Sequence, residues 1–539
     1  MQRRVFGTEC EYALFYSVKH GETRALSEFS GVTDSRGAAG LSFSTLLHPS
    51  TMLPEEVLAQ QVQVPKLYWD DESLLERLKR VTSYLVASLT KRGHPFAGEF
   101  LGNGGRFYID RGAHPEYATP ECATVRDVVA HEKAGDRIVR ELVELAETFM
   151  AETGRPGSLR IFKNNVDSFG TTYGHHENYL VRPRVTENIE FLVPFLVTRQ
   201  IFSGAGKVAT RGTSDEGPYQ LTQRADFIDR VFSDRTSQVR GIINLRKREI
   251  ARQGHNRRLH VLVGDSNMSE YALGLKIGTT ALVLRLLEED DLDDLPLLSF
   301  PVQAIKNISQ AFDCPVEVEN RQGQHYNALD IQRIYLEKVH RFLETHESSP
   351  CEKEILSLWE GTLAGLRGLK ISQGHCTLEE DPGNLRRRID WLLKLWLINR
   401  AQHKSGFDWS DGRARVLDVG YHELDSGSGI FERCEALDLV DRMVDEQEVL
   451  KARTEPPPGT RAWTRGMIIQ STSGKNVELI IKNWEKVKII GRSRSRSAGH
   501  PFGRHVRMIN RLEIALDDPF MANDASAMEK VREFVQCWD

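Results

Sequence analysis

The sequence predicts an α+β protein built on an antiparallel sheet, and three observations support this class. Segments with two-residue alternation are too numerous in the first half for a regular strand-helix-strand repeat. Residues 125–150 have apolar side chains at the three- and four-residue steps of an amphipathic helix. Residues from about 270 to 450 are mostly helical in pattern. The chain of 539 residues, 40% apolar and 27% charged, is long enough to bury a large core.

The first expected strand covers residues 3–16, where alternation places Glu9 and Glu11 on the same side. Residues 18–65 are rich in Ser, Gly, Thr and Pro, and we interpret them as a long inserted loop. A helical pattern follows at 72–91. A strand is then expected at Arg106–Asp110, before the amphipathic helix.

The remaining elements follow the same two periodicities. Strands are expected at 159–164, 178–182 and 258–263, and helices at 192–203, 271–287, 329–345, 352–366 and 385–400. The three prolines of Thr454–Thr460 indicate an extended linker. We therefore expect a large domain over 1–455 and a small C-terminal α/β domain over 456–539. The latter has β patterns at 477–482 and 485–490, followed by an Arg/Ser run at 491–497 that we interpret as a solvated hairpin extension.

Charge and cysteine content exclude several classes of protein. The net charge of −5 gives no global basic field, so we expect no nucleic-acid partner. The seven cysteines are scattered without a C-x-x-C pair, which predicts neither a disulfide framework nor a zinc site. The N-terminus lacks a signal-peptide pattern, and the apolar stretch at 191–197 is too short for a membrane span. We expect a cytoplasmic protein without a membrane partner.

An acidic cluster carries the clearest chemistry. Alternation places Arg106, Tyr108 and Asp110 on one strand face, and a turn then returns Glu116. If this strand lies beside the one carrying Glu9, several carboxylates meet. Carboxylates at that density repel unless a cation lies between them, and hard oxygen ligands select Mg²⁺. The alternative is a set of surface acids on a solvent-facing sheet.

Two further clusters offer cations. Lys163, His175, His176 and Glu177 are dense for a turn, and we interpret the lysine and histidines as donors to a triphosphate; zinc ligation is disfavoured because no cysteine or spaced third histidine accompanies them. The other is a basic run between 246 and 260, which is either a solvated face or a phosphate or carboxylate site. No P-loop or G-x-G-x-x-G is present, so a nucleotide site has to be built on a sheet face. No cysteine has the context of an activated thiolate.

Several motifs resemble those of the Pup ligase and Pup deamidase family, which attach and remove a small ubiquitin-like protein in bacteria. They are MQRRVFGTECEY, NGGRFYIDRGAHPEYATPEC, FKNNVDSFGTTYGHHENYL, PFLVTRQIFSGAGKV, LTQRADFI, RRLHVLVGDSNM, LDIQRIYLEK and LDVGYHEL. The matches run in order from residue 1 to about 430 and resume around Trp484 and 517–520. The resemblance implies a glutamine-synthetase-like catalytic domain followed by a small C-terminal domain.

The resemblance also implies roles for individual residues. It implies Asp110 as the catalytic carboxylate. It implies magnesium ligation by Glu9, Tyr108 and Glu116, and ATP contacts by Arg106, Thr119 and Trp484. The cofactors implied are ATP and Mg²⁺, and the partners are a Pup-like modifier and lysine-bearing protein substrates.

The implied ligase reaction makes the side-chain carboxylate of a C-terminal glutamate electrophilic by phosphorylation with ATP. Asp110 then frees the amine of a substrate lysine for attack. The alternative within the family is a deamidase and depupylase, in which the same aspartate helps to hydrolyse an amide. A small-amine ligase, a protease adaptor and a non-catalytic binding protein are the readings outside it.

Sequence signals within the family conflict. The spacing Asp110-Arg-Gly-Ala-His114 resembles the ligase, whereas the 18–65 insertion and GTECEY resemble the deamidase. We give the spacing more weight because it lies in the site, so we predict a ligase. After IIN the family continues with an acidic stretch, whereas this chain has Leu245-Arg-Lys-Arg-Glu-Ile250, which indicates a divergent branch.

Overall fold

The computed structural model describes most of the chain in detail. The described residues are 4–17, 96–97, 99–110, 114–152, 158–166, 172–209, 218–235, 239–245, 256–289, 292–311, 316–372, 376–425, 427–496 and 505–538. The loop expected at 18–65 and the helix expected at 72–91 lie outside the described residues, so both stay predictions.

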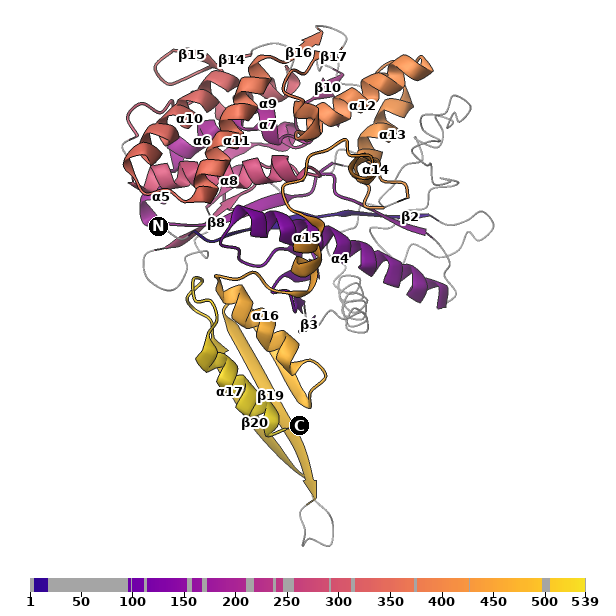
Figure 1. The fold of residues 1–539 in the computed structure, drawn as a ribbon, viewed down its shortest axis with the longest axis vertical. Coiled ribbons are helices and arrows are strands. Elements are labelled where there is room, and N and C mark those ends of the chain that lie inside the picture. Colours follow the sequence, from indigo (N-terminus) through magenta and orange to yellow (C-terminus); the bar gives the residue numbers. More distant parts are fainter. Residues whose placement is uncertain are drawn as a thin grey trace.

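A nine-stranded sheet lies at the centre of the larger part of the molecule (Figure 1). In spatial order its strands are β11 (Arg230–Ser233), β12 (Gly241–Asn244), β13 (Arg257–Val261), β8 (His175–Val181), β1 (Phe6–Glu11), β6 (Pro115–Ala118), β5 (Arg106–Ile109), β4 (Phe100–Leu101) and β3 (Phe96–Ala97). Neighbouring strands are antiparallel except β11 and β12, which are parallel. The α+β class is confirmed, and the parallel pair is a feature that the alternation pattern did not predict.

The register of the central strands gathers polar side chains on one face of the sheet. Glu9 lies opposite His176 on one side, and Glu116 lies opposite both Glu11 and Tyr108. Directly opposed residues share a face, as do residues two apart along a strand. We call the resulting set the polar face: Arg258 and His260 of β13, His176 and Asn178 of β8, Glu9 and Glu11 of β1, Glu116 of β6, and Arg106 and Tyr108 of β5.

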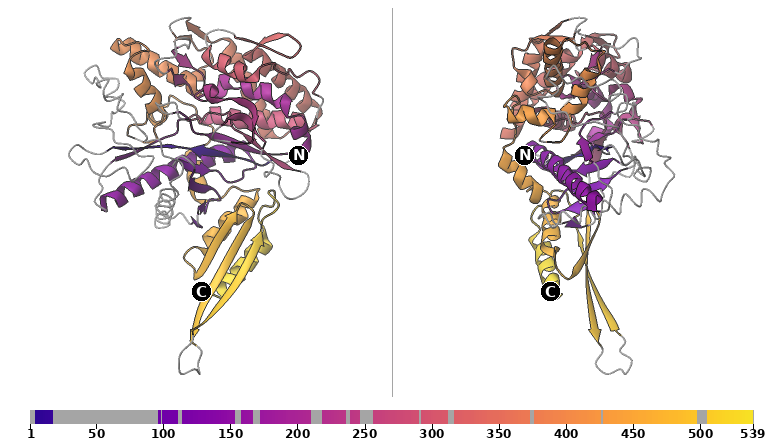
Figure 2. Two further views of the ribbon diagram at one scale, coloured as in Figure 1. Left: turned by 180° about the vertical axis from the view of Figure 1, so that it is seen from behind. Right: turned by 90° about the vertical axis from the view of Figure 1, so that its right-hand side faces the viewer.

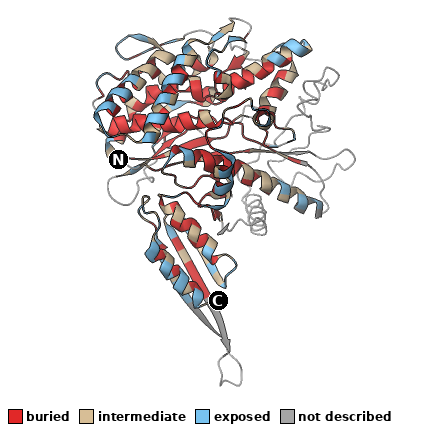
Figure 3. Ribbon diagram, in the orientation of Figure 1, coloured by how far each residue is buried: buried red, intermediate tan, exposed pale blue. Residues whose placement is uncertain are grey.

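The opposite face of the sheet packs against two helices, α4 (Val125–Glu152) and α8 (Glu270–Glu289). The Thr8 hydroxyl of β1 donates to Glu132 of α4 at 2.6 Å, and Lys276 Nζ of α8 lies 3.2 Å from His175 Nδ1 of β8. Helix α8 is buried along nearly its whole length, as Figure 3 shows. This burial explains why its sequence is apolar on all sides rather than along one stripe.

Helices cover the remainder of the large part. Their bounds are α5 (Pro183–Glu187), α6 (Val193–Thr198), α7 (Gln200–Ser203), α9 (Pro301–Gln310), α10 (Ala328–Thr345), α11 (Pro350–Arg367), α12 (Asp390–Ser405), α13 (Gly412–Tyr421), α14 (Ile430–Ala436) and α15 (Glu446–Thr454). Short 3-10 turns lie at Ile189–Leu192, Ala225–Phe227 and Leu385–Arg387. The capping box of Ser349 and Glu352, with Pro350 in the first turn, fixes the start of α11.

Three expected elements are divided or shortened. The strand expected at 3–16 is two strands, because β2 (Ala13–Ser17) leaves the main sheet and pairs with β7 (Ser158–Phe162). The helix expected at 192–203 is divided into α6 and α7. The helix expected at 385–400 begins only at Asp390, where α12 starts after a 3-10 turn. Three further strand pairs are β9–β10 (Lys207–Val208, Tyr219–Gln220), β14–β15 (Glu317–Glu319, His325–Asn327) and β16–β17 (Lys370–Ser372, Thr377–Glu380).

Residues 461–538 form a C-terminal unit that projects from the large part (Figures 1 and 2). It contains α16 (Arg461–Thr472), β18 (Val477–Asn483), β19 (Lys486–Arg496), β20 (His505–Ala515) and α17 (Ala525–Gln536). The three strands form one antiparallel sheet, whose apolar side packs with both helices in a core of its own. Strand β19 continues six residues beyond the expected end at 490, and β20 was not predicted.

Within the described part of the chain, no helix combines the length and apolar character that a bilayer crossing needs. Six cysteines of this part are free thiols.

Candidate functional site

One cluster of acids lies where β1, β5 and β6 meet on the polar face. Oxygen atoms of Glu11, Asp110 and Glu116 all lie within 4.8 Å of one another. The Tyr108 hydroxyl donates a hydrogen bond of 2.5 Å to Glu116. Alternation therefore predicted which of these side chains share a face of the sheet, but β5 does not lie beside β1 as expected, because β6 lies between them. The four side chains form the first set of oxygen atoms that could hold a divalent cation.

The electrostatics of this cluster show an excess of negative charge. Burial raises the pKa of Glu116 well above its ordinary value, and the nearby carboxylates Glu11, Glu9 and Asp110 raise it further. The pKa of Tyr108 is likewise raised, first by burial and then by Glu116 and Glu9, so this side chain is a neutral phenol. A cation among these oxygens would relieve the repulsion, so the donor set fits Mg²⁺.

A second cluster surrounds Glu9. One oxygen of Glu9 accepts from Arg258 at 2.8 Å, and the other lies 3.4 Å from His176 Nδ1 and 3.5 Å from His260 Nε2. Atoms of Glu9, His176 and His260 lie within 4.8 Å of one another, as a shared metal ion requires. Glu9 and Glu116 thus belong to two neighbouring clusters.

The protonation states in this second cluster favour a cation as well. Burial by itself raises the pKa of Glu9, but Arg258 and the two histidines outweigh it and hold the pKa well below the ordinary range. Burial lowers the pKa of His260 to about 4, so this ring is neutral at neutral pH. A neutral imidazole beside a carboxylate is the form in which both ligate metals.

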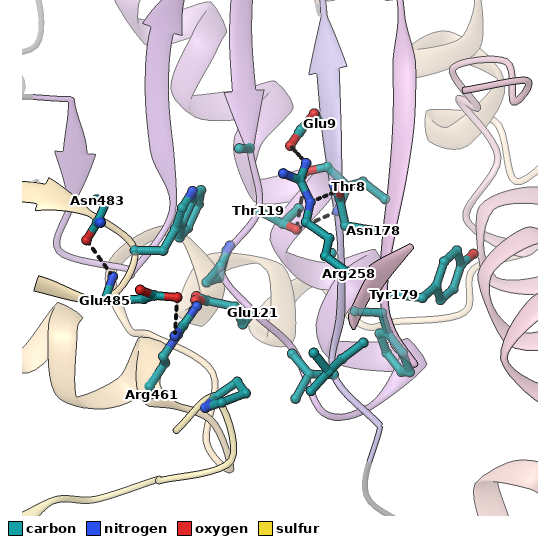
Figure 4. A pocket seen from close by; sticks show the side chains of 18 of the residues that line it. Thr8, Glu9, Thr119, Glu121, Asn178, Tyr179, Arg258, Arg461, Asn483 and Glu485 are labelled. Carbon is teal, nitrogen blue, oxygen red and sulfur yellow. Dashed lines mark hydrogen bonds and ion pairs between the residues drawn. The ribbon is translucent and has the colours of Figure 1, made fainter. Parts of the chain in front are cut away.

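A pocket of about 490 Å³ opens beside Glu9, between the sheet and the C-terminal unit. Figure 4 shows Glu9 and Arg258 on the sheet side of the pocket and Arg461 and Asn483 on the side of the C-terminal unit. The lining also includes Trp484 from the turn between β18 and β19. A pocket of this size, next to two clusters of potential metal ligands, suits a polyanionic small molecule.

The three residues that the resemblance assigns to ATP lie around this pocket in different ways. Thr119 lines it, and its hydroxyl oxygen accepts from the backbone N–H of Thr8 at 2.9 Å. Trp484 also lines it, and its ring packs edge-on against Phe100 with centroids 5.1 Å apart. Arg106 is outside the lining residues; its guanidinium lies over the Tyr108 ring, 4.3 Å from the centroid.

The interpretation of Lys163 and His175 as triphosphate donors is wrong. Both are fully buried on the opposite face of the sheet, where Lys163 pairs with Glu132 and Asp136 at 2.9 Å and His175 lies 3.0 Å from Glu132. Glu177 is also buried there, in an ion pair with Arg199. Only His176 reaches the polar face, because adjacent residues of a strand point to opposite sides.

Several residues of the site were not predicted, or were predicted only as part of a group. Arg258 and His260 belong to the basic run, but their pairing with Glu9 depends on β13 lying next to β8. Residues 246–255 of that run lie outside the described residues. Arg461 and Asn483 carried no signal beyond their nearness to the linker and to Trp484.

A polar sheet face beside a pocket of this size is the arrangement expected of an enzyme that binds a phosphorylated small molecule. The family profile described as Pup-ligase protein matches residues 4–488, and the chain belongs to this family. The family resemblance and the expected class of enzyme, an ATP-dependent ligase family, are therefore confirmed.

The curated relatives are named as ligases. The chain is 38% identical over 416 residues to the Pup--protein ligase of Xylanimonas cellulosilytica, covering 76% of this chain and 88% of the relative. It is 38% identical over 437 residues to that of Acidimicrobium ferrooxidans, covering 80% and 92%. These names favour the ligase over the deamidase, as the spacing beside Asp110 predicted.

Two solved structures share the fold. The Pup ligase PafA in complex with Pup matches with a TM-score of 0.74 and 26% identity, covering 99% of this chain and 93% of that one. PafA in complex with ADP matches with a TM-score of 0.71 and 28% identity, covering 85% and 94%. The glutamine-synthetase-like architecture expected from the resemblance therefore agrees with the structures that this chain matches.

Proposed function

We propose that the protein is an ATP- and magnesium-dependent ligase that joins the side-chain carboxylate of a modifier's C-terminal glutamate to lysines of protein substrates. The observation that carries the proposal is the polar face, where two clusters of metal-ligating side chains lie beside the pocket at the C-terminal unit. The modifier is a Pup-like protein, by analogy with the relatives named as Pup--protein ligases. A cytoplasmic location stays a prediction from the cysteine content.

The pocket is the proposed site of ATP, with contacts from Thr119 and Trp484 in its lining and from Arg106 beside it. Glu9, Tyr108 and Glu116 are the proposed magnesium ligands, and the geometry adds His176 and Glu11 as further candidates. When bound, Mg²⁺ neutralises phosphate charge and so makes the terminal phosphorus open to attack.

The first proposed step is attack of the modifier's glutamate carboxylate on the γ-phosphorus of ATP. The new bond gives a glutamyl phosphate, and the bond to the β-phosphate oxygen breaks to release ADP. The energy of ATP is thereby kept in an acyl phosphate, which makes the acyl carbon electrophilic without a thioester.

The second proposed step is aminolysis, with Asp110 as the base. Asp110 follows β5 and lies with Glu11 and Glu116, so a lysine ammonium directed at the acyl phosphate meets negative charge. Asp110 accepts one proton from the ammonium, the amine attacks the acyl carbon, and the bond to the phosphate oxygen breaks; the second proton of the nitrogen leaves with the inorganic phosphate. The product is an isopeptide bond between modifier and acceptor.

The test uses the full-length protein with ATP, Mg²⁺, a Pup-like modifier ending in glutamate and a lysine-bearing acceptor. The expected result is a conjugate and one ADP per bond, with loss of conjugate in Asp110→Asn. Asp127→Asn is the matched control, because Asp127 is a half-buried aspartate in the first turn of α4, outside the acid cluster, and pairs with Thr124. Ammonia release from a modifier ending in glutamine, without conjugation, would instead establish an amidase.

We also propose that residues 1–455 and 456–539 are separate domains. The C-terminal unit has an apolar core of its own around Val487, Ile489 and Val531. Two separate unfolding transitions in calorimetry of the intact chain are the expected result, and a single cooperative transition would contradict the proposal.

A further inference from the structure

Arg465 of α16 is a fully buried charge at the junction between the C-terminal unit and the sheet. It is absent from the residues that line the pocket, whereas Arg461, one turn earlier, lines it. We infer that Arg465 is a positioning residue for the nucleotide pocket, which holds Trp484 and the turn between β4 and β5 in place. The inference rests on the proposed function, because it takes the pocket as the ATP site.

The guanidinium of Arg465 joins three segments that are distant in sequence. It forms an ion pair with Glu121, which follows β6 and lines the pocket. It donates to the backbone oxygen of Trp484 at 3.0 Å and to that of Gly104, in the turn between β4 and β5, at 2.8 Å. A planar guanidinium can make these bonds at once, which an ammonium cannot.

Two aromatic rings lie against the same guanidinium. Its central carbon is 4.8 Å from the Trp484 ring centroid and 5.5 Å from that of Phe100. Cation–π contact with a desolvated arginine is favourable and orients the rings. Phe100 in turn lies 5.6 Å from Arg106, so contacts run from Arg465 to the strand that carries the ATP and metal residues.

The backbone around Arg465 leaves little room for an alternative position of α16. A Cβ atom added at Gly466 would lie 2.6 Å from the backbone oxygen of Gly102, so only glycine allows this approach. Gly104 has a positive φ of 82°, and a Cβ there would lie 3.0 Å from the backbone oxygen of Ala462. Helix and turn therefore touch backbone to backbone, and Arg465 fixes the orientation of this contact.

Arg461 and Arg465 differ in what they do at the same carboxylate. Arg461 donates to Glu121 at 2.8 Å, to the backbone oxygen of Leu516 at 3.0 Å, and its side chain faces the pocket. Arg465 is not among the lining residues, and it acts on the pocket through Glu121, Trp484, Phe100 and the turn. Its loss should therefore weaken nucleotide binding without removing a contact to the reacting atoms.

The experiment compares Arg465→Met, Arg465→Lys and a matched control in the full-length protein. Arg453→Met is the control, because Arg453 also makes a largely buried ion pair, with Glu141, away from the pocket. We expect Arg465→Met to raise the KM for ATP and the Kd for ADP about tenfold or more, with kcat within about threefold of wild type. Arg465→Lys should give values of KM and Kd between those of wild type and Arg465→Met, and Arg453→Met should leave both constants unchanged.

Three outcomes separate the possibilities. If wild type binds ADP and Arg465→Met binds it equally well, the inference is overturned and the proposed function stands. If Arg465→Met and Arg453→Met lose activity in proportion to a shared loss of thermal stability, the role of Arg465 is structural only. If wild type binds no nucleotide, the proposed function and the inference both fall. Should Arg465→Met not fold, Gly466→Ala tests the same contact, because it moves α16 from the turn without removing a charge, and the same rise in Kd is expected.

Discussion

Protonation of Glu121 should lower the free energy of unfolding below about pH 4.5, and the size of the loss follows from the residues around this carboxylate. Glu121 is 15% exposed and pairs with Arg461 and Arg465. Burial raises its pKa, but the two arginines outweigh burial and bring it from 4.5 to about 2. At about 1.4 kcal/mol per pKa unit, the charged form contributes on the order of 3 kcal/mol to folding.

The sign of the pH dependence follows from the lowered pKa. The unfolded chain binds the proton more readily than the folded one, so this stabilisation is complete above pH 4.5 and declines as the pH falls towards 2. Glu121→Gln should therefore be less stable than wild type by about 3 kcal/mol at pH 7, and the difference should shrink at about pH 3. Urea denaturation followed by tryptophan fluorescence at both pH values measures it.

A matched control tests whether burial causes the effect. Glu448 pairs with Arg126 on the surface, with the two side chains 35% and 44% exposed. Glu448→Gln should cost less than about 1 kcal/mol at pH 7. The reasoning is refuted if the two variants lose equal stability, or if the loss in Glu121→Gln is the same at both pH values.

Substitutions at three further positions have definite expected results. Lys163→Met leaves Glu132 buried with one cation fewer, so the unfolding free energy should fall by about 3–5 kcal/mol; an unchanged urea midpoint would contradict the buried pairing. Gly135→Ala places a Cβ atom 2.2 Å from the Tyr117 ring, so the unfolding free energy should fall by about 1–3 kcal/mol in thermal denaturation. An unchanged unfolding free energy would show that α4 can shift to make room. Trp484→Ala should raise the KM for ATP roughly tenfold and Trp484→Phe much less, because an aromatic surface in the pocket is lost only in the former; equal effects would argue against ring stacking.

The part of the site that was predictable from sequence is the part that depends on strand alternation. Glu9 and Glu11 share a face because they are two residues apart, and so do Arg106 and Tyr108. The spacing along each strand therefore predicts which of its side chains share one face of the sheet. That β1 and β5 lie on either side of β6 depends on long-range strand pairing, which no local sequence pattern encodes.

The errors have the same origin. In His175-His176-Glu177 the alternation is plain, but which of the two sets faces the site depends on the register with Glu9. Arg258 of β13 pairs with Glu9 of β1 across 249 residues of sequence, and β8 lies between the two strands in the sheet. Residues 491–496 of the Arg/Ser run continue β19 and pair with β20, as a hairpin extension requires, but β20 was not predicted as the second strand of this hairpin.

The polar face on one side of the sheet also accounts for the buried charges on the other. A strand that presents Glu9 and Glu11 must place Thr8 in the core, and a polar group there has to be hydrogen-bonded. The Thr8 hydroxyl is satisfied by Glu132 at 2.6 Å, while its backbone N–H holds Thr119 in the pocket at 2.9 Å. A slip of one residue in β1 would exchange the acids with Thr8 and Cys10 and leave Glu132 without this partner. The buried network therefore stabilises the register that keeps the acids on the polar face.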